Sequence, residues 1–255
     1  NSNNVVSNNY VYLFEYSTSG THWQDWFGIY VHDAIIEDND VTVIDQTTGY
    51  WCFETVGIKG DRSTIRDNHI TFGEKDQSSC SDAYGIKSGA DNTNRSIIDG
   101  NIITVVRDGY NRGIWASYSD IINNDIQGTG YSSDYAIGHG DYNVIRNNTI
   151  TDMNHGINCD GRWDNVIDSN TINVNNWGIY ANNAQGTHTI TNNYINKTGG
   201  DKLLQVTNTD SVIVTNNSFL STGGDGFYFE NTYVDIRYNL LTTPGRGIHC
   251  ENQVG

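Results

Sequence analysis

Two lysines stand at the same place in neighbouring copies of a short motif. Lys59 lies in GIKGD and Lys87 in GIKSG, each two residues after the first glycine. The stretch around them, residues 57 to 112, holds 8 of the 14 Lys and Arg residues and also 8 acids, in a chain whose formal charge is −16. A base and a second cation that neutralises a carboxylate are what β-elimination from a uronate sugar requires. The alternative is that both lysines are solvated and pair with Asp61 and Asp91.

A second group combines carboxylates with a histidine. Asp134, His139 and Asp141 lie in SDYAIGHGDYN, and Asp160 follows in GINCDGRWDN. If these segments are neighbouring repeats, their carboxylates can lie about 5 to 9 Å apart, the separation that glycoside hydrolysis needs. Asp160, with Asp141 or Asp134, would then supply the acid and the base. The alternative for His139 is a buried, hydrogen-bonded core histidine.

The elements that position these residues repeat along the chain. A pattern of one apolar residue, two further residues, Asn, one residue and one apolar residue occurs ten times, at spacings of 22 to 33 residues. Its asparagines are Asn9, Asn39, Asn68, Asn101, Asn124, Asn148, Asn170, Asn193, Asn217 and Asn239. A second motif, Gly-Ile-x or a variant, precedes most of these asparagines. Short apolar runs bounded by Asn, Gly and Asp predict two short strands per unit, one from each motif.

Ten such units predict an all-β solenoid of about ten coils that forms one domain over residues 1–255. The isoleucines are expected to fill its interior, and the stacked asparagines to form a hydrogen-bonded ladder. From a ladder asparagine to the next motif glycine the distance falls from 19 residues at the start to 8 by the sixth coil, so long loops are expected on the N-terminal coils. Because both ends fall inside a unit, we interpret the sequence as part of a longer chain.

The Gly-Ile and Ile-x-x-Asn-x-Ile coils, over residues 5 to 252, resemble the right-handed parallel β-helix proteins, that is, the pectate-lyase-like superfamily and the NosD-type repeat. This superfamily includes polysaccharide lyases and hydrolases, tailspikes and adhesins, so the fold alone does not select a function. The resemblance to its lyases implies Lys87 or Lys59 as the base and Ca²⁺ held by Asp61 and Asp91. GHG and NCDG are similar to fragments of polygalacturonase motifs, although their chain order is reversed here.

One face of the solenoid is expected to bind a ligand. Strand alternation directs the second and fourth residues after each motif glycine outward. Aromatic rings stack on the apolar faces of sugars, and polar groups bond their hydroxyls, so this face predicts a sugar-polymer site. The residues assigned to it are Tyr30, His32, Trp115, Asn158, Tyr180 and Asn182, together with Arg112 and, from a long loop, Trp51. The alternative for the loop aromatics is a satellite core beneath the loops.

The cysteines occupy two kinds of position. Cys52 and Cys80 each lie five residues before a motif glycine, which predicts Cα atoms about 5 Å apart and a disulfide bond. Such a bond indicates an oxidising setting outside the cytoplasm. Cys159 and Cys250 lie three residues after their glycines and are expected to be buried free thiols.

These features predict an extracellular or cell-surface protein that binds and cleaves a polysaccharide. A hydrolase is favoured over a lyase, since an acidic chain repels an anionic polymer. The alternative of another class is a non-catalytic rod: a surface-layer, adhesin or tailspike-like segment. Exposed aromatic residues would allow a homotrimer of side-by-side rods. The acidity argues against a nucleic acid partner, and no apolar run approaches the length of a membrane span, about 18 residues.

Overall fold

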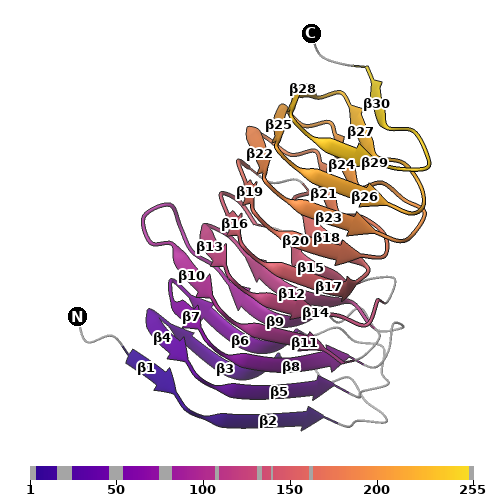
Figure 1. The fold of residues 1–255 in the computed structure, drawn as a ribbon. Coiled ribbons are helices and arrows are strands. Elements are labelled where there is room, and N and C mark those ends of the chain that lie inside the picture. Colours follow the sequence, from indigo (N-terminus) through magenta and orange to yellow (C-terminus); the bar gives the residue numbers. More distant parts are fainter. Residues whose placement is uncertain are drawn as a thin grey trace.

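The computed structural model describes residues 4–15, 25–45, 54–74, 82–106, 109–130, 134–138, 140–160 and 163–252. These residues form three parallel sheets of ten strands each. The chain visits the three sheets in turn, and each circuit is one coil, so the coils stack along a single axis with the termini at opposite ends (Figure 1). The predicted all-β solenoid of about ten coils is confirmed. Among the described residues, no helix is long and apolar enough to span a membrane.

The first sheet contains the first strand of every coil. Its strands are β1 (Asn4–Ser7), β4 (Ala34–Glu37), β7 (Thr64–Arg66), β10 (Ser96–Asp99), β13 (Ser119–Ile122), β16 (Val144–Arg146), β19 (Val166–Asp168), β22 (Thr187–Thr191), β25 (Ser211–Thr215) and β28 (Tyr233–Arg237).

The second sheet follows after a sharp turn. Its strands are β2 (Tyr10–Glu15), β5 (Asp40–Asp45), β8 (His69–Glu74), β11 (Ile102–Val105), β14 (Asp125–Gln127), β17 (Thr149–Met153), β20 (Thr171–Val174), β23 (Tyr194–Lys197), β26 (Ser218–Ser221) and β29 (Leu240–Thr242).

The third sheet carries the Gly-Ile motifs. Its strands are β3 (Trp26–His32), β6 (Thr55–Asp61), β9 (Ala83–Ser88), β12 (Asn111–Ala116), β15 (Tyr135–Gly138), β18 (His155–Asn158), β21 (Ile179–Asn182), β24 (Leu204–Thr207), β27 (Phe227–Glu230) and β30 (Ile248–Glu251).

Each coil has three strands, whereas the sequence predicted two. The asparagine motif is divided between the first and second sheets, because the residue before each ladder asparagine adopts a left-handed conformation. For the ten positions φ lies between +55° and +66°. Asn and Asp tolerate this region and Gly adopts it freely, which explains why Asn147, Asp67 and Gly100 occur there. The strand therefore bends sharply at a point where a run of apolar residues suggests continuity.

The predicted asparagine ladder is confirmed over its full length. Each ladder side chain donates from Nδ2 to Oδ1 of the next ladder asparagine, at 2.9 to 3.0 Å from Asn9 to Asn239. Each Oδ1 beyond the first also accepts the backbone N–H of the preceding ladder residue; the Asn124 N to Asn148 Oδ1 distance, for example, is 2.9 Å. Parallel stacking thus satisfies polar groups that are buried in the corner of every coil.

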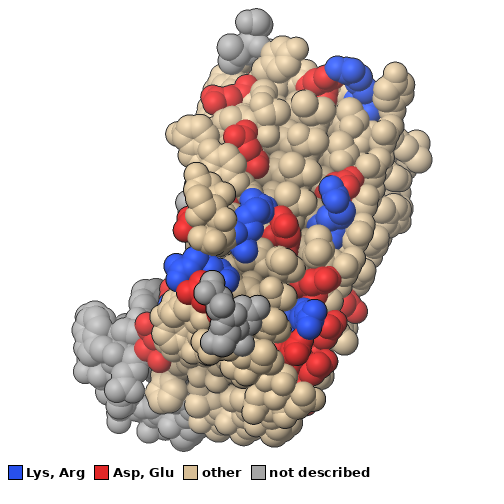
Figure 2. Space-filling model, turned by 90° about the vertical axis from the view of Figure 1, so that its left-hand side faces the viewer, with Lys and Arg blue, Asp and Glu red and all other residues tan. Residues whose placement is uncertain are grey.

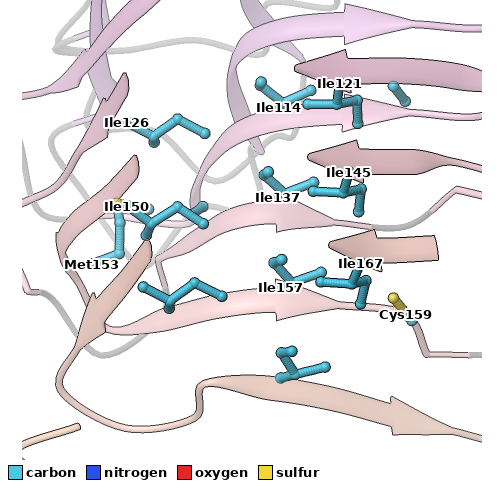
Figure 3. Close-up of a cluster of buried hydrophobic side chains, with 14 of the residues drawn as sticks. Ile114, Ile121, Ile126, Ile137, Ile145, Ile150, Met153, Ile157, Cys159 and Ile167 are labelled. Carbon is cyan, nitrogen blue, oxygen red and sulfur yellow. The ribbon is translucent and has the colours of Figure 1, made fainter. Parts of the chain in front are cut away.

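Isoleucines fill the interior, as predicted. Ile114, Ile137 and Ile157 from the third sheet meet the isoleucines of the first sheet across the axis (Figure 3). Cys159 is a buried free thiol, and burial raises its pKa to about 12. The prediction for Cys250 was wrong: this free cysteine is exposed because it lies on β30, the last strand of the third sheet, with no described coil covering it.

Many charged side chains at the surface form ion pairs. Figure 2 views the side of the molecule on which the first sheet lies, and basic groups there lie beside acidic ones. Arg62 pairs with Asp33 at 2.7 Å, and Arg146 pairs with Asp168 at 2.9 Å. Exposed pairs of this kind contribute little to stability. Their main effect is that these cations have an acidic partner at the surface.

Candidate functional site

The outer face of the third sheet is the candidate site, because most of the residues that the sequence analysis selected as chemically active lie there. Parallel register aligns the position two residues after each motif glycine in one column. The column runs through Tyr30, Lys59, Lys87, Trp115, Gly138, Asn158 and Tyr180. Except for Asn158, which is 6% exposed, and Gly138, these side chains are partly exposed, which confirms the predicted direction.

The glycines of this motif allow the coils to approach one another. A Cβ atom added at Gly85 would lie 2.7 Å from the carbonyl oxygen of Gly113 in the next coil and 2.7 Å from Cγ2 of Ile103. No side chain fits there, so the glycine is required by packing. Ile86, which follows, points inward and Lys87 outward.

In the first two coils, three side chains form a hydrogen-bonded chain. Tyr30 Oη lies 2.9 Å from His32 Nε2, and His32 Nδ1 lies 3.2 Å from Asp61 Oδ2. The other carboxylate oxygen of Asp61 accepts the backbone N–H of Gly89 at 2.6 Å. The carboxylate therefore fixes the imidazole, and the imidazole faces a phenol.

Lys59 lies beside this chain and is held by aromatic rings. Its Nζ is 5.0 Å from the ring centres of both Phe27 and Tyr30. In the part of the chain that the structure describes, no carboxylate lies within ion-pair distance of Lys59. The other described Lys and Arg side chains pair with acids, apart from the buried Lys197, which donates to backbone carbonyls. Among the described residues, Lys59 is thus contacted by aromatic rings and by no acid.

In the third and fourth coils, the cations are paired. Lys87 forms an ion pair with Glu54, and its Nζ lies 4.8 Å from the ring centre of Tyr84. The predicted alternative, that the lysines pair with Asp61 and Asp91, is therefore wrong. Lys87 pairs instead with Glu54, which directly precedes β6, and no described carboxylate pairs with Lys59.

Arg112 is the centre of a second network in these coils. Its guanidinium pairs with Asp82, donates to Tyr84 Oη at 2.8 Å and lies 4.4 Å from the ring centre of Trp115. The tyrosine in turn donates to Asp82 Oδ2 at 3.0 Å, and burial raises its pKa. Arg112 is therefore fixed beside the partly exposed indole of Trp115.

Further along the face, aromatic rings form a continuous stack. His155 lies between Tyr135 and Trp177, with ring centres 4.5 Å from each, and Trp177 stacks on Tyr180 at 4.8 Å. Burial lowers the pKa of His155 and raises that of Tyr135 and Tyr180. The histidine is consequently neutral near pH 7, and the stack presents a largely uncharged surface.

The three predicted catalytic carboxylates have different surroundings. Asp134 is fully buried in the corner before β15, where it accepts from the Nδ2 of Asn111 at 3.0 Å. Asp141 lies in the turn after the sheet and accepts the backbone N–H of Trp163 at 3.1 Å. Asp160 is half-buried and follows two residues after Asn158, the register partner of Tyr180; its charge, after burial, contributes to raising the pKa values of Tyr135 and Tyr180. Of the three, Asp160 has the surroundings that suit a role on the outer face.

The carboxylates predicted to hold calcium also have protein partners. Oδ1 of Asp91 accepts from the backbone N–H of Thr93 and of Asn94, each at 2.9 Å, and hydrogen bonds led by the Thr93 hydroxyl lower its pKa. Asp61 contacts His32 and Gly89, as described above. Within the described ranges, no group of three or more His, Cys, Asp and Glu side chains is placed to hold a metal ion.

The remaining predicted residues are placed as follows. Asn158 Oδ1 accepts the backbone N–H of Asp160 at 2.8 Å, and Asn182 Oδ1 accepts from the Thr207 hydroxyl at 2.7 Å. Trp51, His139 and the predicted disulfide partners Cys52 and Cys80 lie outside the described residues.

A family model described as "Right handed beta helix region" matches residues 112–255. The chain belongs to this right-handed β-helix family. No curated protein and no solved structure matches the chain. Membership of this family explains the stacked coils and their register. It does not identify a function, which depends on the side chains at the surface of this β-helix.

Sequence reasoning missed one column of this β-helix. The residue directly before each motif glycine also lies at the outer face, in the register Tyr84, Arg112, Tyr135 and His155. In a regular strand, the residue before the glycine and the residue two after it point to opposite faces. The aromatic residues before the glycines were therefore not predicted to lie at the outer face. The repeated occurrence of Tyr, His and Trp before Gly or Ala was the available signal.

Proposed function

We propose that this β-helix acts outside the cell and binds a polysaccharide along the outer face of its third sheet. The observation that carries the proposal is the row of aromatic side chains on or beside β9, β12, β15, β18 and β21. The row consists of Tyr84, Trp115, Tyr135, His155, Trp177 and Tyr180, of which Tyr84 and His155 are buried and the other four are partly exposed. A regular polymer of sugars suits a surface on which rings and polar groups recur at the coil spacing of about 4.8 Å.

Removal of one partly exposed ring tests this proposal. The Trp115→Ala and Tyr180→Ala variants are expected to weaken binding to the preferred polysaccharide about tenfold each, which corresponds to about 1.4 kcal/mol. Isothermal titration calorimetry or affinity electrophoresis against a panel of neutral and acidic polysaccharides measures this. Tyr194→Ala is the matched control, because Tyr194 is 41% exposed but lies on the second sheet. If no polysaccharide binds, or if the Trp115 and Tyr180 variants bind as tightly as the control, the protein is better described as a structural rod.

Hydrolysis of the bound polymer is the second candidate function, and the position of Asp160 favours it. A carboxyl group beside the aromatic stack can protonate a glycosidic oxygen of a sugar bound there. The unaltered protein should then release new reducing ends without ultraviolet-absorbing products, and Asp160→Asn should abolish the release. If Asp160→Asn retains full hydrolysis, or if EDTA or Lys87→Ala removes it instead, this assignment is wrong.

A further inference from the structure

The outer face of the first sheet carries two columns of side chains that the candidate site does not use. Parallel register places one outward residue of each strand in an apolar column and the residue two positions later in a charged column. The apolar column contains Ile35, Ile97, Val144, Val166 and Ile213. The charged column contains Glu37, Arg66, Asp99, Ile122, Arg146 and Asp168. None of these side chains is buried.

The charged column is close to neutral, although the formal charge of the chain is −16. Two of its arginines form ion pairs along the column, Arg66 with Glu37 and Arg146 with Asp168. Basic and acidic groups lie beside one another on this side of the molecule (Figure 2). The net charge of the chain therefore does not make this face repel a second copy. The adjoining apolar column favours contact with another protein over contact with water.

The order of the charges along the column identifies the partner. Ile122 lies on β13, in the fifth coil. One coil before it is Asp99 and one coil after it is Arg146. Two coils before it is Arg66 and two coils after it is Asp168. The signs on the two sides of Ile122 are opposite at each step, which is the pattern that a self-complementary surface with a two-fold axis requires.

A two-fold axis along the strand direction, over Ile122, brings the faces of two copies together as antiparallel rods. Asp99 of each copy then lies opposite Arg146 of the other, and Arg66 lies opposite Asp168. Asp99 gains most from this contact. Among the described residues, its carboxylate accepts from Nδ2 of Asn123 at 2.8 Å but forms no ion pair.

The same axis brings the two apolar columns into contact. Ile97 of each copy, one coil before the axis, meets Val144 of the other, one coil after it. Asp120 lies in this column on the axis and faces its own copy. Its charge is compensated by Arg95, whose Nη2 lies 2.7 Å from Oδ1 of Asp120. The centre of the contact therefore has no uncompensated charge.

The charges also select one register. A shift by one coil in one direction would set Arg66 opposite Arg146, and a shift in the other direction would set Asp99 opposite Asp168. Like charges that face one another across an interface are unfavourable. Parallel rods would set the apolar column against the charged column. The antiparallel arrangement centred on Ile122 avoids all of these contacts.

We propose that two copies of this chain form an antiparallel dimer through the outer faces of their first sheets, with the two-fold axis over Ile122. The third sheet of each copy stays uncovered, so the dimer presents two separate outer faces to a ligand. The inference goes beyond the proposed polysaccharide binding and does not depend on it.

The size of the contact predicts a dimer of modest affinity. Nine overlapping coils give a contact about 43 Å long, and strands of about four residues make it about 13 Å wide. Both copies together would bury about 1,100 Å², which is near the lower end for specific protein interfaces, about 1,000 Å². The tenth coil of each copy extends beyond the overlap.

Sedimentation equilibrium of the purified chain over a wide range of concentrations tests the proposal, and a reversible monomer–dimer equilibrium is expected. Ile122→Asp should raise the dissociation constant at least about 100-fold, because like charges then meet on the axis. The same column already accommodates aspartate at positions 99 and 168, so the variant should fold. Arg237→Glu is the control, since Arg237 continues the column into the tenth coil, outside the overlap. It should leave the dissociation constant unchanged.

Two charge reversals test the antiparallel contact itself. Asp99→Arg sets arginines opposite each other in both symmetry-related contacts, and Arg146→Glu sets acids opposite each other. Each variant alone should therefore dimerise about tenfold more weakly or worse. In an equimolar mixture, the introduced arginine of one variant faces the introduced glutamate of the other, and the second contact is the original one. The mixed dimer should form as readily as the unaltered dimer.

The outcomes that contradict the proposal are distinct. A monomer at every concentration, or a trimer, overturns it. Failure of the mixture to recover shows that Asp99 and Arg146 do not meet across the interface, which overturns the antiparallel arrangement. An effect of Arg237→Glu as large as that of Arg146→Glu overturns the register. Loss of polysaccharide binding bears on the proposed function alone.

Discussion

At the residue scale, the ladder asparagines form a continuous row of mostly buried hydrogen bonds through the described coils. Asn148 is 1% exposed, accepts from both the backbone N–H and the Nδ2 of Asn124, and donates to Oδ1 of Asn170 and to the carbonyl of Ile121. Few other side chains combine this small size with both a donor and an acceptor. The identity of the residue is therefore set by hydrogen bonding.

Replacement of Asn148 by alanine is expected to lower the free energy of unfolding by about 3 kcal/mol, because several buried polar groups each lose a partner worth about 1 to 3 kcal/mol. Urea unfolding followed by circular dichroism measures the change. Asn147→Gly is the matched control: Asn147 is exposed, and its φ of +56° suits glycine. Equal stabilities of the two variants would contradict a stabilising role for the ladder.

The residues of the candidate site were only partly predictable at this scale. Tyr30, His32, Lys59 and Asp61 were all recognised as outward and chemically active, yet they were assigned to three separate roles. Their mutual contacts depend on side-chain conformations and on register between coils, which a single sequence does not reveal. Burial of Asp134 could not be foreseen either, because it depends on the neighbouring Asn111 and Thr129 side chains.

At the element scale, the Gly-Ile strand shows how packing selects residues. The motif glycines lie where the coils approach most closely, so their substitution should overpack the interior. Gly138, in contrast, is a glycine of the same sheet for which an added Cβ would contact only Cε3 of Trp115, at 3.8 Å. The two positions therefore form a natural comparison.

Gly85→Ala is expected to reduce stability by about 1 to 3 kcal/mol, since its Cβ would meet a backbone carbonyl that cannot move aside. Gly138→Ala should change stability by less than about 0.5 kcal/mol. Thermal and urea unfolding of both variants provide the measurement. A greater loss of stability in the Gly138 variant would show that coil contact does not determine the motif.

The number of strands per coil was predicted incorrectly, and the reason also lies at the element scale. Apolar periodicity located the asparagine motif and predicted it as one strand, because Ile, Asn and Ile in succession give no sign of a sharp bend. The turn depends on backbone conformation at the preceding residue, and that residue varies from Asn and Asp to Ser, Gly and Tyr. The Gly-Ile strand was predicted correctly because it has no internal turn.

At the scale of the whole molecule, the β-helix is a stack of similar units in which each coil contacts mainly its neighbours. Stability in such proteins is approximately a sum of terms for single units and for their interfaces. A complete unit can then be removed without loss of the architecture. Removal of part of a unit breaks the register of all three sheets.

Deletion of residues 149–170 is expected to give a folded protein, because Thr171 then follows Asn148 and takes the place of its sheet partner Thr149. Circular dichroism should show an unchanged strand signal per residue, and small-angle scattering should show a rod shorter by about 4.8 Å. Deletion of residues 149–159 is the control and should prevent cooperative unfolding. A folded, cooperative half-unit deletion would show that register is not what holds the coils together.

The unbroken ladder also aligns the dipoles of its side-chain amides along the axis of the molecule. Every ladder amide from Asn9 to Asn217 donates from its amino group to the amide oxygen of the next ladder asparagine, so the amide dipoles add head to tail. Aligned hydrogen bonds polarise one another, and each bond is strengthened by those on both sides. A defect in the middle of the column interrupts this mutual polarisation in two directions, whereas a defect at either end interrupts it in one.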